Sequence, residues 1–249
     1  MNELALFAGD GGGILGGRLL GWTCVGAIEL DEYRRRVLMA RQDDGCLEPF
    51  PVWDDVRTFD GEPWCGLVDV LTAGFPCQDV TIAGKGGGVA NGARSGLWRE
   101  VARIGRQVRA PYVLLENGPL LTSRGLDLVL GDLASMGYDA EWGMFSAAGV
   151  GAPHRRKRIW VLAYSPGILR ERLQVQPELR PQVQRAQEGH APEPPPLCSW
   201  SRGSGALVHF PRMDDGVANR LDAVAATGDG QLPAVVVEAW TVLSGRICL

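Results

Sequence analysis

Short apolar segments alternate with amphipathic segments along the first two thirds of this chain, which limits the folds open to it. The apolar segments predict strands at 4–7, 25–30, 68–73, 112–116 and 159–163, and the segments between them predict helices at 14–20, 32–41, 97–108 and 126–136. Strands that alternate with helices form βαβ units, so we expect an α/β fold with a Rossmann-like, doubly wound and mostly parallel sheet. Ligands of such sheets bind beyond the carboxyl ends of the strands.

The alternation stops in the last third of the chain. Residues 165–211 are rich in Pro, Gln, Arg and Glu, which predicts a small irregular insert. We therefore expect a catalytic domain at 1–164, a short recognition or linker region at 165–211, and a C-terminal segment at 212–249 that packs back on the catalytic domain. The residues expected to dock on the sheet are Val235, Val236, Ala239, Trp240 and Leu243.

The composition indicates a globular protein with one basic segment. No run of about 18 apolar residues and no secretory pattern occurs in the sequence, so we expect a cytoplasmic protein without membrane contact. The six cysteines lack metal-site spacing, which favours thiols, mostly buried, over a zinc site or disulfides. Residues 154–185 hold eight Arg or Lys and two Glu, a net +6 that leaves −10 for the rest of the chain. Such a segment suits either a polyanion or a solvated surface.

A glycine-rich turn follows the first predicted strand. In FAGDGGGILGG, residues 7–17, Gly11, Gly13 and Gly16 fit the spacing G-x-G-x-x-G, and Glu29 stands at the end of the next strand. Glycines at this spacing admit a cofactor close to the backbone, and an acid at the second strand binds ribose hydroxyls. The pattern indicates a cofactor that contains adenosine, and NAD is one candidate. The alternative is a glycine-rich turn that merely packs tightly.

A cysteine stands at the end of another predicted strand, in GFPCQD at 74–79. Pro76 biases the preceding residue toward extended geometry and would hold the Cys77 thiol at the mouth of the strand. The glycine-rich continuation, which contains Lys85 and Arg94, is typical of a lid that closes over substrate. A purely structural cysteine is the competing interpretation.

Two further stretches carry polar groups to strand ends. LLENGP at 114–119 places Glu116 after an apolar strand, and GVGAPHRRKRIWVLA at 149–163 places an Arg-rich turn before one. A carboxylate there can hold or exchange a proton, and arginines can fix phosphate or carbonyl oxygens. Either stretch could instead form surface salt bridges.

In this order, the motifs resemble the DNA cytosine-5 methyltransferase family, and its compact phage or prophage members in particular. The matching stretches are FAGDGG, the acid after the second strand, Asp55-Val56, GFPCQ, the RSGLW loop, Glu116-Asn117, the Arg-x-Arg of Arg156 and Arg158, Arg212, and GDGQLP near the end. The resemblance implies a class I fold that uses S-adenosylmethionine, with residues 165–211 as a small target-recognition insert.

The resemblance also implies a role for each matching residue. Cys77 would attack C6 of a flipped cytosine, Glu116 would hold the N3 and N4 edge, and Arg156 with Arg158 would contact the base carbonyl. The residues implied in cofactor binding are Phe7, Gly9, Gly11, Glu29, Leu30, Asp55, Val56, Pro76, Leu97 and Asp229, and those implied in DNA binding are Gln78, Lys85, Arg94, Arg155 and Arg212.

The resemblance predicts a monomer that acts on double-stranded DNA without a metal, in a restriction-modification or phage setting. Whether a restriction endonuclease accompanies it stays open. The family pattern has Gly-Asn where this chain has Gly228-Asp229, which raises the possibility of a modified S-adenosylmethionine as the donor. The same motifs are also compatible with a tRNA cytosine-5 methyltransferase of this fold and with an inactive DNA-binding homologue.

Overall fold

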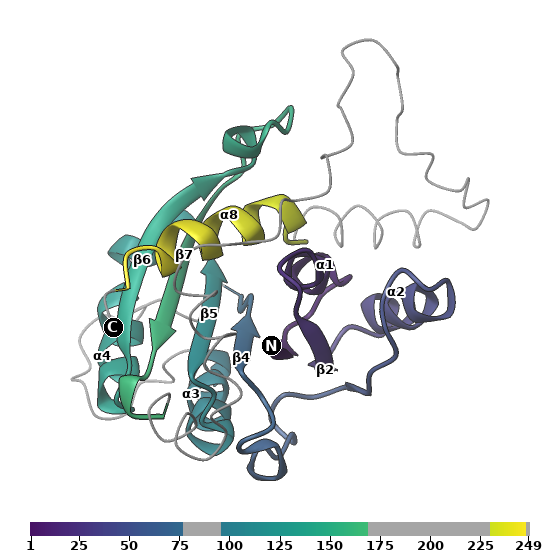
Figure 1. Cartoon of the computed structure of the whole chain (residues 1–249), viewed down its shortest axis with the longest axis horizontal. Coiled ribbons are helices and arrows are strands. Elements are labelled where there is room, and N and C mark those ends of the chain that lie inside the picture. Colours follow the sequence, from purple (N-terminus) through teal and green to yellow (C-terminus); the bar gives the residue numbers. More distant parts are fainter. Residues whose placement is uncertain (77–95, 169–229, 248–249) are drawn as a thin grey trace, which may run out of the picture.

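The computed structural model describes residues 1–76, 96–168 and 230–247. Its central element is a seven-stranded sheet (Figure 1). The strands are β1 (Asn2–Leu6), β2 (Thr23–Ile28), β3 (Val52–Trp53), β4 (Val70–Ala73), β5 (Tyr112–Asn117), β6 (Asp139–Ser146) and β7 (Lys157–Tyr164), in the sheet order β3-β2-β1-β4-β5-β7-β6. Every pair from β3 to β5 is parallel, and β7 is antiparallel to both β5 and β6. The predicted α/β class with a mostly parallel sheet is confirmed.

Helices connect the strands at nearly the predicted positions. The α-helices are α1 (Gly12–Leu19), α2 (Glu32–Asp43), α3 (Gly96–Val108), α4 (Leu126–Ser135) and α8 (Pro233–Ser244), and the 3-10 helices are η1 (Glu62–Trp64), η3 (Pro119–Ser123) and η4 (Ala147–Val150). The Asp31 side chain caps α2 by accepting a hydrogen bond from the Arg34 N–H at 2.9 Å. Pro233 starts α8, where the missing N–H costs nothing.

Three local features differ from the sequence prediction. Strand β6 was not expected, because it lies at the sheet edge and only one of its eight residues is fully buried, so its sequence has no apolar run. Strand β3 was also missed, since it has only two residues. The first strand ends at Leu6 and not at Phe7, because Phe7 turns into the left-handed region with φ 54°.

Two hydrophobic layers cover the two faces of the sheet. Successive side chains of a strand point to opposite faces, and β5 shows this clearly. Val113 and Leu115 pack in the cluster that includes α3 and α4, whereas Tyr112 and Leu114 pack in the cluster that includes α8. Each layer therefore fixes β5, whose carboxyl end carries Glu116.

Helix α8 brings the end of the described chain back onto the sheet. Its residues Val235, Val236, Ala239, Trp240 and Leu243 are all buried. A Cβ on Gly16 would lie 2.5 Å from the Cβ of Val236, so glycine in α1 is what allows α8 to approach. The three-part division of the chain stays a prediction, because most of residues 165–229 lie outside the described part.

The described cysteines are free thiols, but their burial differs from the expectation. Cys24 is buried, whereas Cys46 and Cys65 are exposed because they follow α2 and η1 in surface turns. Across the described ranges, no helix is both long enough and apolar enough to cross a membrane.

Candidate active site

The carboxyl ends of β1 to β5, the start of α3 and the start of β7 carry most of the predicted residues. The described members are Phe7, Gly9, Gly11, Glu29, Leu30, Asp55, Val56, Pro76, Leu97, Glu116, Arg155, Arg156 and Arg158. The predicted residues Cys77, Gln78, Lys85, Arg94, Arg212 and Asp229 lie outside the described residues. Strand β7 is antiparallel to β5, so its start, with Arg158, meets the end of β5, with Glu116.

The glycine-rich turn is held to the end of β2 by Glu29. The backbone takes positive φ at Phe7, Gly9 and Gly11 (54°, 59° and 88°), which favours glycine at the last two positions. The Gly9 N–H donates to Glu29 Oε2 at 2.7 Å, and the Asp31 N–H donates to Oε1 at 2.9 Å. Each carboxylate oxygen keeps capacity for another donor, so Glu29 can still accept hydrogen bonds from hydroxyl groups.

A small hollow lies beside this turn. It is lined by Phe7, Gly13, Ile14, Thr72, Gly74 and Gln231, among others. The hollow is therefore shared by the ends of β1 and β4 and by the residues that precede α8.

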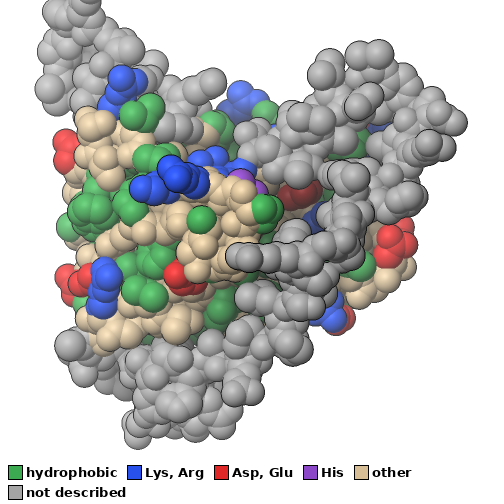
Figure 2. Space-filling view, turned by 90° about the horizontal axis from the view of Figure 1, so that it is seen from above, with side chains coloured by type: hydrophobic (Ala, Val, Ile, Leu, Met, Phe, Trp, Pro, Cys, Tyr) green, Lys and Arg blue, Asp and Glu red, His purple; other side chains and the backbone are tan. Residues whose placement is uncertain are grey.

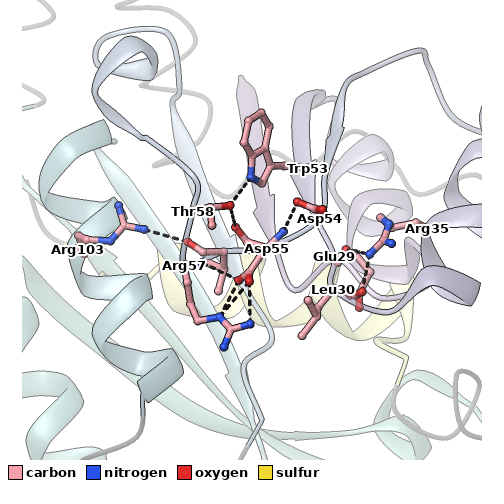
Figure 3. A network of polar contacts seen from close by, with 10 residues as sticks. Glu29, Leu30, Arg35, Trp53, Asp54, Asp55, Arg57, Thr58 and Arg103 are labelled. Carbon is pink, nitrogen blue, oxygen red and sulfur yellow. Dashed lines mark hydrogen bonds and ion pairs between the residues drawn. The ribbon is translucent and has the colours of Figure 1, made fainter.

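The Asp55 carboxylate faces Arg57 beyond the end of β3 (Figure 3). The two groups form an ion pair at 2.7 Å, and hydrogen bonds from Arg57 hold the pKa of Asp55 below its usual range. Neighbouring Val56 is buried, and Arg103 donates to its carbonyl at 2.9 Å. The role of Arg57 was not predicted from the sequence. Each Asp55 oxygen accepts two hydrogen bonds from Arg57, so any other donor to Asp55 has to compete with it.

The predicted apolar contacts of the cofactor differ in exposure. Leu30 is 61% exposed after β2. Pro76 is also exposed. Leu97, in contrast, packs at the start of α3 against the core.

Glu116 is a buried carboxylate with basic partners. Its Oε1 lies 2.9 Å from Nε of Arg158, and its side chain is 9% exposed. Burial raises the pKa of Glu116 above its ordinary value, whereas Arg158, Arg156 and a hydrogen bond from Gln231 act in the opposite direction. A carboxyl group with these opposing influences can both hold a proton and accept one.

The next residue connects Glu116 to the cysteine-bearing segment. The Asn117 amide donates to the Phe75 carbonyl at 2.9 Å, and its Oδ1 accepts from the Gly118 N–H at 2.7 Å. The sequence motif included Asn117 but gave it no separate role.

A basic turn lies beside the pocket of Glu116. In Figure 2, Lys and Arg side chains gather on this face together with a histidine. Along residues 154–158, His154, Arg155 and Lys157 are exposed, whereas Arg156 and Arg158 are partly buried. Exposed cations here suit contacts with an anionic backbone, and the two partly buried arginines line the Glu116 pocket.

Sequence reasoning missed Gln231, which lines both the hollow beside Phe7 and the pocket of Glu116. Its only signal was its place in GDGQLP. Among the described side chains, no group of three or more His, Cys, Asp or Glu residues could hold a metal ion.

Comparisons with known proteins agree on the family. The model of the C-5 cytosine-specific DNA methylase family matches residues 1–194. The Type II methyltransferase M.CviJI of Paramecium bursaria Chlorella virus IL3A is 34% identical over 163 residues, which cover 65% of this chain and 42% of the relative. The Type II methyltransferase M.NgoBI of Neisseria gonorrhoeae is 34% identical over 171 residues, which cover 67% of this chain and 51% of the relative.

Solved structures show the same fold. A DNA modification methyltransferase encoded within a prophage (E. coli) matches with a TM-score of 0.54 and 22% identity, over 68% of this chain and 47% of that one. The Dnmt2 methyltransferase of S. pombe matches with a TM-score of 0.54 and 20% identity, over 66% of this chain and 51% of that one. The chain spans about half the length of the curated relatives it matches. On the family-model match and the shared site motifs, the chain belongs to the C-5 cytosine-specific DNA methylase family.

Proposed function

We propose that this protein is a DNA cytosine-5 methyltransferase that uses S-adenosylmethionine. The observation that carries the proposal is the buried Glu116 carboxyl, paired with Arg158 at the same sheet edge as the Glu29 turn. The Glu116–Arg158 part of this edge suits a cytosine ring, and the Glu29 part suits a donor that contains adenosine. Family membership supports the same reaction.

The residues of this edge fit the proposed cofactor. Gly9 and Gly11 leave the turn free of side chains, and Glu29 retains acceptor capacity for the ribose hydroxyls. Asp55 would accept from the adenine amine in competition with Arg57, and Leu30 would pack against the ring. We also assign Phe7, Val56, Pro76, Leu97 and Asp229 to this site. S-adenosylmethionine supplies an electrophilic methyl group.

The proposed reaction begins at Cys77. Its thiolate adds to C6 of a flipped cytosine, while Glu116 in its protonated form donates its proton to N3 and so neutralises the negative charge that develops there. Arg158 keeps the Glu116 carboxyl in place, and Arg156 holds the base carbonyl. Transfer of the methyl group to C5 would leave the donor sulfur as a neutral thioether. A base then removes the C5 proton, the Cys77 sulfur leaves C6, and N3 returns its proton to Glu116, which restores the ring.

The proposed substrate is double-stranded DNA. The exposed cations of the turn at 154–158 support phosphate contacts, and we assign Arg155, Gln78, Lys85, Arg94 and Arg212 to the DNA-binding surface. Residues 165–211 would form the target-recognition region between the catalytic domain and the returning C-terminal segment.

Substitution of the nucleophile tests the reaction. Labelled S-adenosylmethionine is incubated with DNA or with tRNA, and transfer is compared between the wild type and Cys77→Ala. We expect transfer to DNA only, loss of transfer in Cys77→Ala with cofactor binding retained, and a covalent wild-type adduct on DNA that contains 5-fluorocytosine. Transfer to tRNA alone, or methylation by the alanine variant, would refute the proposal.

The donor is a finer question that Asp229 raises. An ionised Asp adds a negative charge where the family pattern has an amide, and this charge would act either on the cofactor carboxylate or on its sulfonium. We propose that plain S-adenosylmethionine is the donor and that Asp229 is neutralised locally. Asp229→Asn should then give the same cofactor affinity and the same product mass; a heavier product from the wild type would indicate a modified donor.

A further inference from the structure

Gln231 occupies the space between the two halves of the site. A Cβ on Gly13 would lie 2.2 Å from Gln231 Oε1, and a Cβ on Gly12 would lie 2.1 Å from the Gln231 backbone oxygen. A Cβ on Gly74 would lie 2.8 Å from Gln231 Nε2 and 3.4 Å from Glu116 Oε2. The glutamine side chain therefore extends from the glycine-rich turn, past the end of β4, to the carboxyl group at the end of β5.

We propose that Gln231 is a positioning residue that couples the glycine-rich turn to Glu116, with its amide donating to the Glu116 carboxylate and its carbonyl facing Gly13. The effect of this contact on catalysis rests on the proposed function, whereas the contact itself does not. Gln231 belongs neither to the glycine-rich turn nor to β5, but its side chain lies between them.

The orientation of the amide follows from its neighbours. A carboxylate accepts hydrogen bonds only, so the NH₂ group of Gln231 has to face Glu116 and its carbonyl has to face the turn. Glu116 Oε1 already pairs with Arg158, and Oε2 is the oxygen on the Gly74 side, near Nε2 of Gln231. Gln231 is thus a neutral donor that complements the charged ones.

The backbone around Gln231 makes this arrangement rigid. Residue 231 precedes α8, whose first turn is anchored by Pro233 and by the contact of Val236 with Gly16. The backbone carbonyl of Gln231 lies against Gly12, so residue 231 cannot shift toward the turn. The run of three glycines at 11–13 accordingly has two functions, since Gly11 needs a positive φ and Gly12 and Gly13 make room for Gln231.

Gln231 sets the ionisation of Glu116 together with two arginines. Among the described residues, the titratable groups that line the Glu116 pocket besides Glu116 itself are Arg156 and Arg158. Removal of the Gln231 amide leaves both charges in place and removes one donor to the ionised carboxylate. The Glu116 carboxyl should then protonate at a higher pH than in the wild type.

An NMR titration tests this without DNA or cofactor. The full chain is labelled with ¹³C at the glutamate carboxyl carbons, and the Glu116 signal is assigned by its loss in Glu116→Gln. The titration midpoint of Glu116 is compared among the wild type, Gln231→Leu, Gln231→Met, and the control Gln107→Leu. Gln107 is a suitable control because it also forms hydrogen bonds through its side-chain amide. Its carbonyl accepts from the Arg103 side chain and from the Gly61 N–H.

We expect an upward shift of the midpoint in both Gln231 variants and none in the control. Gln231→Met is unbranched, uncharged and nearly the same size as the wild type, so it reports even if Gln231→Leu fails to fold. An unchanged midpoint in a folded Gln231 variant would overturn the inference. Because no transfer is measured, this outcome is independent of whether the protein methylates DNA.

Substitution of Gly12 and Gly13 provides a second test of the inference. Gly13→Ala should displace the Gln231 side chain and raise the Glu116 midpoint, but it should add no further shift in the Gln231→Leu background. Gly12→Ala meets the backbone oxygen instead, so its loss of thermal stability should be the same in both backgrounds. Independent effects of Gly13→Ala and Gln231→Leu on the midpoint would contradict the coupling.

Transfer kinetics then connect the contact to catalysis. Loss of one hydrogen bond to a charged group predicts about a tenfold lower kcat for Gln231→Leu, with the KM for S-adenosylmethionine changed less than about threefold. A change in KM alone would place Gln231 in cofactor binding and not in the positioning of Glu116.

Discussion

The Asn117 amide donates a hydrogen bond to the Phe75 carbonyl at 2.9 Å, and this bond links residues that are 42 positions apart. It fixes the end of β5, which carries Glu116, against the segment that leads to Cys77. Both residues are buried, so water does not replace the bond if it is lost. The carboxyl group and the proposed nucleophile thus share one support.

Asn117→Asp removes the donor and keeps the oxygen that accepts from Gly118. We expect the rate of covalent trapping on 5-fluorocytosine DNA to fall about tenfold or more, because an unmade buried hydrogen bond costs roughly 1–3 kcal/mol. Cofactor affinity should stay unchanged. The matched control is Asn2→Asp, since Asn2 makes the same type of bond, to the Leu67 carbonyl, at an exposed site. Equal trapping rates in the wild type and Asn117→Asp would show that the bond from Asn117 to Phe75 does not position Cys77.

Removal of the Arg158 guanidinium should affect catalysis more than DNA affinity. Arg158→Gln leaves the buried Glu116 carboxylate without its closest charge partner, and breaking such a pair costs about 3 kcal/mol. We expect kcat to fall by about 100-fold or more and the acidic form of Glu116 to persist to higher pH. Steady-state transfer across pH measures both effects.

Arg155→Gln is the control for this substitution, because Arg155 is exposed in the same turn. It should leave kcat nearly unchanged and weaken DNA binding, with the slope of log affinity against log salt reduced by about one. A similar loss of kcat in both variants would mean that the turn acts as a whole and that the Glu116 pair has no special role.

The strand ends and the residues placed on them were predictable because local sequence determines them. Glu29 and Glu116 follow buried apolar runs, and the parallel arrangement of those runs brings their ends together. The start of β7 reaches the same edge only because β7 runs antiparallel to β5, and the sequence of β7 does not show this direction.

Contacts that depend on tertiary packing or on the path of an irregular turn were not predictable in the same way. Gln231 approaches Gly13 because α8 packs on α1, and Arg57 pairs with Asp55 because the chain turns beyond β3. Neither residue stands out by composition or periodicity. Single polar side chains in irregular segments are informative only once the tertiary packing is known.

Arg57 should compete with the cofactor for Asp55. The pair is exposed on the Arg57 side, where the side chain is 63% exposed, so displacement is easy. We expect Arg57→Ala to bind S-adenosylhomocysteine up to about threefold more tightly, and Asp55→Ala to bind it about tenfold more weakly. Isothermal titration calorimetry measures both. Weaker binding in Arg57→Ala would show instead that Arg57 contacts the ligand.

The last prediction concerns Glu3, a buried acid far from the proposed reaction. Thr72 Oγ1 donates to Glu3 Oε1 at 2.7 Å, and within the described residues Oε2 has no hydrogen-bond partner. Burial raises the pKa of Glu3 to about 7 from an ordinary value of 4.5. A pKa raised by folding means that the native state prefers the protonated acid, so its contribution to stability is complete below about pH 4.5 and is lost as the pH rises through 7.

Glu3→Gln keeps the acceptor for Thr72 and removes the charge. The variant should match the wild type near pH 4.5 and exceed its free energy of unfolding by about 3 kcal/mol above pH 7, the equivalent of the shift from 4.5 to about 7. Chemical denaturation at several pH values, with the wild type subtracted, isolates this contribution from those of other groups. Glu62→Gln is the control, because Glu62 is exposed at the start of η1. A stability difference between Glu3→Gln and the wild type that does not depend on pH would show that folding does not shift the pKa of Glu3.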